Sequence, residues 1–207
     1  MTPLSPETPD SSAAQRVLDA AERLFYSRGV QAVGIDMVVA DAGVGLKTLY
    51  AHYRSKDRLV EAYLRRLNQR FLDRLQARMA RLQGRDQVLA VFDALGDWFA
   101  EPEFSGCAFI NVAGELHTNP VARAIAREHK QSLRALLQRA ARATAVTDPD
   151  TLADRLMLLV EGAVVTAYVE GDELAAVRAR SAAAALMDCA GQPHGDDVPS
   201  RAADRLQ

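Results

Sequence analysis

The chain has 207 residues, with 25 lysines and arginines against 27 aspartates and glutamates, and 49% of its residues are hydrophobic. This length corresponds to one domain, or to a small domain joined to a larger one, and the apolar content argues against wholesale disorder. The two cysteines exclude a disulfide framework, and no apolar stretch approaches the roughly 18–20 residues of a membrane span. Because the opening residues also lack the pattern of a secretory signal, we expect a soluble cytoplasmic protein.

The net charge of −2 conceals an asymmetry along the chain. Residues 11–85 carry 14 basic and 7 acidic side chains, whereas residues 86–207 carry 11 basic and 18 acidic ones. A basic segment beside an acidic one suggests that the first meets a polyanion. The alternative is that many of the arginines lie on the solvated face of one helix, so the charge needs a motif beside it.

The amino-terminal part predicts a tail followed by a helix. Residues 1–10 hold three prolines and little apolar material, which is typical of a flexible tail. The first helix is expected to begin at Ser11 or Ser12 as N-cap, with Gln15 where a capping box requires Glu or Gln, and to end at Gly29.

Helical periodicity continues to the end of the chain without a strand pattern of useful length. Short helices are predicted over 35–42 and 46–52 with a turn at Gly43, and Ser55 is a candidate N-cap for a long helix to about residue 81. With Asn119 and Asp148 as N-caps before prolines, further helices are predicted over 86–100, 105–116, 120–145, 149–169 and 172–190. The expectation is an all-α chain of about nine helices, with a second flexible tail over 191–207.

The two short helices have the pattern of a helix-turn-helix, which places its second helix in the major groove of DNA. Apolar residues suited to hold the pair against the first helix are Val38, Val39, Ala42, Val44 and Leu49. Outward polar and aromatic groups are Lys47, Thr48, Tyr50, His52, Tyr53 and Lys56. The pattern alone is weak, because helix pairs with glycine turns are common in all-helical proteins.

The residues around this turn make the interpretation specific. Residues 42–50 read AGVGLKTLY and residues 51–59 read AHYRSKDRL. This run resembles the signature of TetR-family repressors, roughly AGVS-x-x-T-L-Y-x-H-F-x-S-K-E-x-L, and the resemblance extends over about residues 16–60. It implies a helix-turn-helix DNA-binding domain over 11–56 and a larger ligand-binding and dimerisation domain over 57–190.

The resemblance assigns DNA contact to the second short helix and the residues after it. Thr48 and Tyr50 occupy positions that usually meet DNA, and Lys56 matches a lysine that usually meets phosphate at a helix N-terminus. Lys47 stands at a variable position and either reads a base or lies over a phosphate. The complete set of predicted DNA-binding residues is Gly45, Lys47, Thr48, Tyr50, His52, Tyr53, Arg54 and Lys56.

Some residues depart from the family pattern, and several keep a structural alternative. Gly45 replaces a Ser or Thr and loses a cap hydroxyl worth about 0.5 kcal/mol, while Arg54 replaces a frequent proline and adds a charge. Val33-Gly34 stands where hydroxyl residues are common. Tyr50 is alternatively half-buried against the first helix, and His52 packs or faces phosphate. Most of a row of arginines is expected to form a solvated face: Arg65, Arg66, Arg70, Arg74, Arg78 and Arg81.

For the larger domain the resemblance implies a pocket for a small apolar or aromatic effector. Asn111 and Glu115 lie one turn apart on an otherwise apolar segment, so they either satisfy each other in the core or orient a ligand. Aromatic residues are candidates for pocket lining or for ordinary core, and Cys107 is interpreted as a small buried hydrophobe. The predicted ligand-binding residues are Trp98, Phe99, Phe109, Asn111, Glu115 and Tyr168.

The last two predicted helices are interpreted as a dimer face that forms a four-helix bundle with its copy. A dimer suits a protein that binds two half-sites of one operator. The alternative is that the apolar stripe faces the subunit's own core. The predicted interface residues are Leu156, Leu159, Ala163, Val177 and Ser181.

The function predicted from these features is a homodimeric repressor that a small molecule releases from a palindromic operator, without cofactor or metal. An activator or a ligand-independent regulator would carry the same DNA motif and remains an alternative. The rival from another class is an enzyme built on Cys107, Glu115, His117 and His129. Their spacing matches no metal or triad pattern, and no CxxC, HExxH or GxSxG motif is present.

Overall fold

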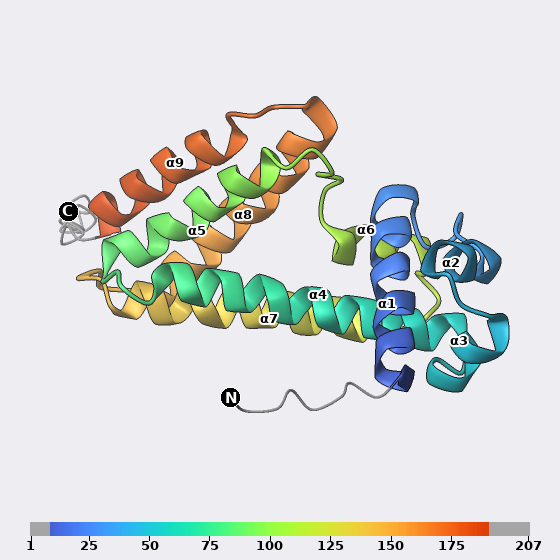
Figure 1. The fold of residues 1–207 in the computed structure, drawn as a ribbon. Coiled ribbons are helices and arrows are strands. Elements are labelled where there is room, and N and C mark those ends of the chain that lie inside the picture. Colours follow the sequence, from blue (N-terminus) through green and yellow to red (C-terminus); the bar gives the residue numbers. More distant parts are fainter. Residues whose placement is uncertain (1–8, 191–207) are drawn as a thin grey trace, which may run out of the picture.

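The computed structural model describes residues 9–190, which form nine α-helices and no strand, so the all-α prediction is confirmed for this part of the chain. Helices α1 (Pro9–Arg28), α2 (Ile35–Ala42) and α3 (Leu46–His52) lie together at one end (Figure 1). Helix α4 (Lys56–Met79) runs from this small unit into a larger body. The remaining helices are α5 (Arg85–Phe99), α6 (Ala108–Glu115), α7 (Pro120–Arg142), α8 (Pro149–Glu170) and α9 (Ala175–Ala190).

The small unit is built on the predicted helix-turn-helix, and the bounds of both short helices are confirmed. Gly43 closes α2 in the left-handed conformation, with φ of 62°, which glycine adopts without the steric cost of a Cβ. Val38 and Leu49 are fully buried, and Ala42 is nearly so. These side chains join Val17 and Phe25 of α1 in one apolar core, which fixes the orientation of α3 relative to α1.

Helix α4 connects the small unit to the larger body, and hydrogen bonds fix its first turns. Its first turn is closed by the Ser55 hydroxyl, which accepts a hydrogen bond from the backbone N–H of Arg58 at 3.2 Å, as predicted. About two helical turns beyond Arg58, the guanidinium of Arg66 donates to Asp19 at 2.6 Å, to Glu22 at 2.5 Å and to the carbonyl of Leu18 at 2.9 Å. These bonds hold α1 across α4.

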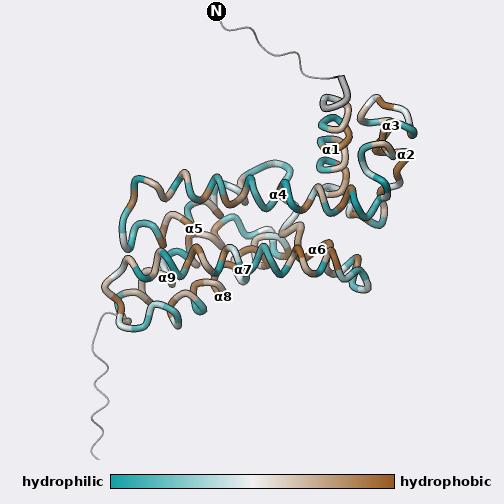
Figure 2. Tube along the Cα trace, turned by 90° about the horizontal axis from the view of Figure 1, so that it is seen from below, coloured by the Kyte–Doolittle hydropathy of each residue, from teal (hydrophilic) through white to brown (hydrophobic). Residues whose placement is uncertain are grey.

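The larger body packs α4 beside α7 and packs α5 against α8 and α9 (Figures 1 and 2). Its core contains fully buried aliphatic and aromatic residues such as Phe92, Leu137 and Leu156. The predicted caps Asn119 and Asp148 are confirmed, since their side chains accept hydrogen bonds from the first turns of α7 and α8. Among residues 9–190, no helix combines the length and apolar character that crossing a membrane requires.

Four predicted element bounds are wrong, and one of them is the end of α7, which stops at Arg142 instead of residue 145. Helix α1 begins at Pro9, so Ser11 and Ser12 lie inside it, and the amide of Gln15 donates to Asp19 instead of completing a capping box. Residues 105–107 form a loop before α6, and residues 172–174 precede α9. The predicted tail over 191–207 and residues 1–8 of the other tail lie outside the described residues.

The loop before α6 has a physical cause in a contact with α1. The hydroxyl of Tyr26 accepts a hydrogen bond from the backbone N–H of Ser105 at 3.1 Å and donates one to the carbonyl of Gly106 at 3.2 Å. Gly106 has a φ of 75°, and a Cβ there would lie 2.9 Å from the ring of Tyr168. The Gly106 carbonyl, which a longer helix would use internally, is therefore engaged by α1, and the positive φ of Gly106 is not helical.

Candidate nucleic-acid interface and effector cavity

Helix α3 presents one apolar face inward and one polar face outward. Leu49 points into the core of the small unit, whereas Tyr50 keeps 44% of its surface exposed and Lys47 is exposed. Thr48 is partly exposed between them. Gly45 forms the N-cap in extended conformation without a side-chain hydrogen bond, as expected for a residue without a hydroxyl. Lys47, Thr48 and Tyr50 therefore lie on the side of α3 that a groove-binding helix would present to DNA.

Three cations around α3 lack an acidic partner in the described part of the chain. Neither Lys47, Arg54 nor Lys56 forms an ion pair with another residue of the range 9–190. Lys56 is the first residue of α4, where the unpaired N–H groups of the helix end add partial positive charge. A phosphate would therefore meet side-chain and backbone donors together at this position.

Tyr53 is placed differently from the other predicted DNA-contact residues. Its hydroxyl donates to the carbonyl of Ala14 at 3.2 Å, and its backbone N–H donates to the carbonyl of Leu49 at 2.8 Å to close α3. Partial burial raises the pKa of the Tyr53 phenol. The side chain thus ties α3 to α1, and His52 beside it is half-buried.

Most of the arginine row is solvent-exposed, as predicted, with Arg66 as the half-buried exception, and the arginines within α4 also form ion pairs. Helix α4 is mostly hydrophilic along its length (Figure 2), but its charges reach acidic residues of neighbouring helices. Arg74 binds Glu101 at 3.0 Å, and Arg70 binds Glu22 of α1. The other pairs are Arg58 and Arg65 with Glu61, Arg65 also with Glu128 of α7, Arg66 with Asp19 and Glu22, and Arg78 with Asp97.

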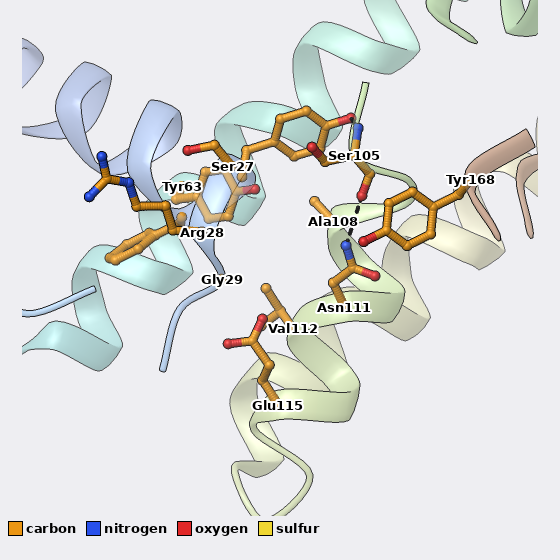
Figure 3. Close-up of a pocket in the computed structure, with 12 residues that line it drawn as sticks. Ser27, Arg28, Gly29, Tyr63, Ser105, Ala108, Asn111, Val112, Glu115 and Tyr168 are labelled. Carbon is orange, nitrogen blue, oxygen red and sulfur yellow. Dashed lines mark hydrogen bonds between the residues drawn. The ribbon is translucent and has the colours of Figure 1, made fainter. Parts of the chain in front are cut away.

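A cavity of about 390 Å³ lies where the end of α1 meets α4, α6 and the end of α8. Asn111, Glu115 and Tyr168, half of the predicted ligand-binding set, line this cavity (Figure 3). Tyr26 and Tyr63 line it as well. A volume of this size lies within the range of small-molecule sites.

Asn111 and Glu115 do not satisfy each other. The amide of Asn111 donates to the carbonyl of Ser105 at 3.0 Å (Figure 3). The carboxylate of Glu115 accepts a hydrogen bond from the backbone N–H of Gln31 at 2.7 Å, and the Gln31 amide donates to the carbonyl of Glu115. Both side chains thus join α6 to neighbouring loops while they border the same cavity.

The other predicted ligand residues belong to aromatic packing. Trp98 and Phe99 cluster with Phe104, with ring centroids 5.0–5.8 Å apart. Phe109 stacks on His129 with centroids 3.8 Å apart, and the ring nitrogen Nδ1 of His129 lies 2.8 Å from Asn68 Oδ1. Burial lowers the pKa of His129 to about 3, so this ring is neutral. None of the three predicted residues lines the cavity.

The residues of the rival enzyme are held by separate partners. Cys107 is buried, as predicted, and its sulfur accepts from Lys130 Nζ at 3.6 Å, while Lys130 pairs with Glu161 at 2.7 Å. Glu115 binds Gln31, and His117 is exposed. In the described part of the chain, no group of three or more His, Cys, Asp or Glu residues is placed to hold a metal ion.

The predicted dimer stripe on α8 faces the subunit's own core, which was the alternative interpretation of these residues. Leu156 is fully buried, Ala163 is 6% exposed and Leu159 is partly buried against the core, so these residues pack inside the subunit. Val177 and Ser181 of α9 are exposed, as an interface requires. A different apolar surface, here called the α8–α9 face, is exposed on the same two helices and on the residue before α9: Leu158, Val165, Val169, Leu174 and Val177.

Two important residues escaped the sequence analysis. Tyr63 is 1% exposed, lines the cavity and packs edge-on against Phe25 with ring centroids 5.7 Å apart. Its spacing from Leu59 and Val60 on α4 marks it as a core position, but core position alone does not reveal a cavity wall. Arg66 was indistinguishable from the other arginines of its row, because its acidic partners lie 44 and 47 positions earlier in the chain.

Comparisons with known proteins agree with this arrangement. Residues 17–63 match the family model described as bacterial regulatory proteins, tetR family, and residues 84–183 match the one described as tetracyclin repressor-like, C-terminal domain. The crystal structure of SCO4454, a TetR-family transcriptional regulator from Streptomyces coelicolor, superposes with a TM-score of 0.81 at 28% identity, covering 88% of this chain and 97% of that one.

Curated relatives match over a shorter length. The HTH-type transcriptional regulator Rv1255c of Mycobacterium tuberculosis is 37% identical over 68 residues, which are 33% of this chain and 34% of that protein. The HTH-type transcriptional repressor KstR2 of Mycolicibacterium smegmatis is 34% identical over 64 residues, 30% and 31% of the two chains. The match therefore spans about a third of these relatives. With its two family domains and its fold, the chain belongs to the TetR family and is a DNA-binding transcriptional regulator.

Proposed function

We propose that the protein is a cytoplasmic homodimeric repressor that binds a palindromic operator and leaves it when a small molecule binds. The observation that carries the proposal is the unpaired basic surface around α3, where Lys47, Arg54 and Lys56 have no acidic partner among the described residues. The similarity of part of this chain to the transcriptional repressor KstR2 supports repression over activation.

In this proposal α3 enters the major groove and the flanking cations meet phosphates. Tyr50, Thr48 and Lys47 contact base edges, since they lie on the outward side of α3. Lys56 and Arg54 bind the backbone, and Gly45 lets the groove wall approach the start of α3. Tyr53 contributes by holding α3 to α1 through Ala14, with His52 packed beside it.

The dimer forms through the α8–α9 face. Leu158 and Val169 are 73% and 72% exposed, and Leu174 and Val177 are each 59% exposed. Apolar side chains exposed along two adjacent helices are a feature of interaction surfaces. A two-fold axis at this face would present one α3 from each subunit to successive half-sites.

Release follows from a shift of the small unit relative to the larger body. The cavity that we propose for the effector touches α1, α4, α6 and α8, so a molecule bound there contacts both parts. To convert mostly bound protein into mostly free protein, the effector must prefer the non-binding arrangement by about 5 kcal/mol.

Fluorescence anisotropy with the DNA upstream of the protein's own gene tests DNA binding. We expect about 1000-fold preference over a scrambled duplex and loss of that preference in Tyr50→Ala. Lys56→Ala should weaken binding to both duplexes alike. The matched control is Arg74→Ala, because Arg74 is exposed but paired with Glu101. The proposal would be overturned if wild type bound both duplexes equally and selection from random DNA then enriched no preferred sequence.

A further inference from the structure

We propose that the cavity between α1, α4, α6 and α8 binds a small organic cation, an amine attached to an aromatic or apolar body. The inference rests on the proposed function, because it names the chemical class of the effector. It starts from three polar side chains that border the cavity and each offer an acceptor oxygen, those of Glu115, Asn111 and Tyr63 (Figure 3).

Two of these acceptors come from α6. The carboxylate of Glu115 accepts one hydrogen bond, from Gln31, and forms no ion pair with any residue of the range 9–190. The side-chain oxygen of Asn111 accepts no hydrogen bond within that range, since only its amide nitrogen is bonded, to Ser105. A carboxylate without a cationic partner beside a free carbonyl oxygen is suited to an ammonium group.

The third group is the hydroxyl of Tyr63. This oxygen is buried, as the 1% exposure of Tyr63 shows, and it has no hydrogen-bond partner among the described residues. Figure 3 shows the ring on the side of the cavity opposite Asn111. An unpaired buried hydroxyl carries a desolvation cost that a ligand N–H can remove by donating to it. Burial raises the pKa of this phenol, so the hydroxyl is neutral and does not repel or attract a charge by ionising.

The surroundings favour a positive charge. The cavity is bordered by the last turn of α1 from Phe25 to Arg28, and the carbonyl end of a helix carries partial negative charge. The one basic side chain at its edge, Arg28, directs its guanidinium away from Glu115 and Asn111 (Figure 3). Aromatic rings of Phe25, Tyr26 and Tyr168 complete the wall, and their faces attract cations.

A cation in this position would act on the joint between the two parts. Glu115 binds the backbone of Gln31 in the loop between α1 and α2, so a ligand that draws the carboxylate toward itself competes with that contact. The carboxylate also lies against Gly29, where a Cβ would be 2.9 Å from Glu115 Oε1. Ligand binding is therefore coupled to the contact between the small unit and α6.

The test compares three probes of similar size that differ in charge: 2-phenylethylamine, 2-phenylethanol and 3-phenylpropionate. Ligand-observed NMR titrations of the full chain without DNA, at pH 7, give their dissociation constants. We expect the amine to bind at least about tenfold more tightly than either other probe, with Glu115→Gln abolishing that preference. Tyr63→Phe should weaken amine binding about threefold or more.

Glu103→Gln is the matched control, because Glu103 is an exposed carboxylate on the loop before α6 and does not line the cavity. It should leave amine binding unchanged. Glu115→Gln keeps an acceptor for Gln31, and thermal unfolding checks that both cavity variants remain folded. Equal affinity for amine and alcohol, preference for the anion, or amine binding unchanged in both cavity variants would each overturn the inference.

Operator binding measured on the same samples separates the two proposals. Intact operator binding without amine preference overturns the cation site and leaves the repressor standing. Amine preference that depends on Glu115 in a protein without operator binding supports the site and overturns the repressor.

Discussion

Two basic regions of the molecule have similar composition and different roles. Around α3, Lys47, Arg54 and Lys56 lack acidic partners among the described residues. Along α4, arginines from Arg58 to Arg78 pair with carboxylates of α1, α4, α5 and α7. The surplus of positive charge in residues 11–85 therefore divides into charge open to a polyanion and charge used inside the subunit. Partners, more than numbers of basic residues, decide which region can bind DNA.

The largest effect is expected where a paired arginine is also partly buried. The Arg66 side chain is 18% exposed and its partner Glu22 is 17% exposed, so Arg66→Ala would leave Glu22 and Asp19 without their inner cation. We expect unfolding free energy to fall by about 3 kcal/mol, measured by urea denaturation. In the control Arg74→Ala the change should stay within about 0.5 kcal/mol. Equal stabilities of the two variants would contradict the conclusion that Arg66 is an internal structural cation.

The second effect concerns the unpaired cations. The double variant Arg54→Gln/Lys56→Gln should lower DNA affinity about tenfold to a hundredfold and reduce the slope of log affinity against log salt by about 2, since two phosphate contacts are lost. The matched variant Arg74→Gln/Arg78→Gln removes two paired charges from α4 and should leave the slope unchanged. A salt slope that responds equally to both variants would show that the paired arginines also meet DNA.

His129 belongs with the groups satisfied inside the subunit. Its pKa is lowered from 6.5 to about 3 by burial, so the unfolded chain binds a proton between these values and the folded chain does not. Above pH 6.5 the free energy of unfolding is nearly unaffected by protonation of this histidine. As the pH falls from 6.5 to 5, the free energy of unfolding decreases by about 1.5–2 kcal/mol. Denaturation curves of His129→Gln should lack this component, whereas the exposed His117→Gln should retain it.

The smallest effect refines the DNA-contact end. Gly45 caps α3 without a side-chain hydrogen bond, so Gly45→Ser should raise unfolding free energy by a few tenths of a kcal/mol, about 0.5 at most. Thermal denaturation measures this change. Destabilisation would show that the backbone at this position does not tolerate a Cβ. The anisotropy assay would then show whether DNA approaches residue 45 closely.

The sequence predicted what local chemistry determines. Bounds of α2 and α3 follow from apolar spacing and Gly43, and Ser55, Asn119 and Asp148 cap as predicted because capping needs only neighbouring residues. The loop before α6 depends on Tyr26, about eighty positions away, so periodicity extended the helix wrongly. In α8, apolar residues occupy more than one face, and spacing does not distinguish Leu156, which is buried, from Leu158, which is exposed.

For the sites, local pattern located the residues but not their surroundings. Lys47 and Tyr50 are outward on α3, as the pattern indicated, whereas Tyr53 is engaged with Ala14 of α1. Asn111 and Glu115 were singled out because polar residues interrupt an apolar helix, and both border the cavity. Tyr63 was missed because a tyrosine among apolar neighbours signals core, and its missing partner is a three-dimensional property.

The attachment of Arg66 to α1 bears on protein engineering. The match to the amino-terminal family domain ends at residue 63, three positions before the guanidinium that binds Asp19, Glu22 and Leu18. A chimera joined at that boundary would graft the recognition helices onto a foreign fourth helix without their cation. Junctions placed after Arg70, which also binds Glu22, would transplant the whole electrostatic anchor and preserve the orientation of the grafted module.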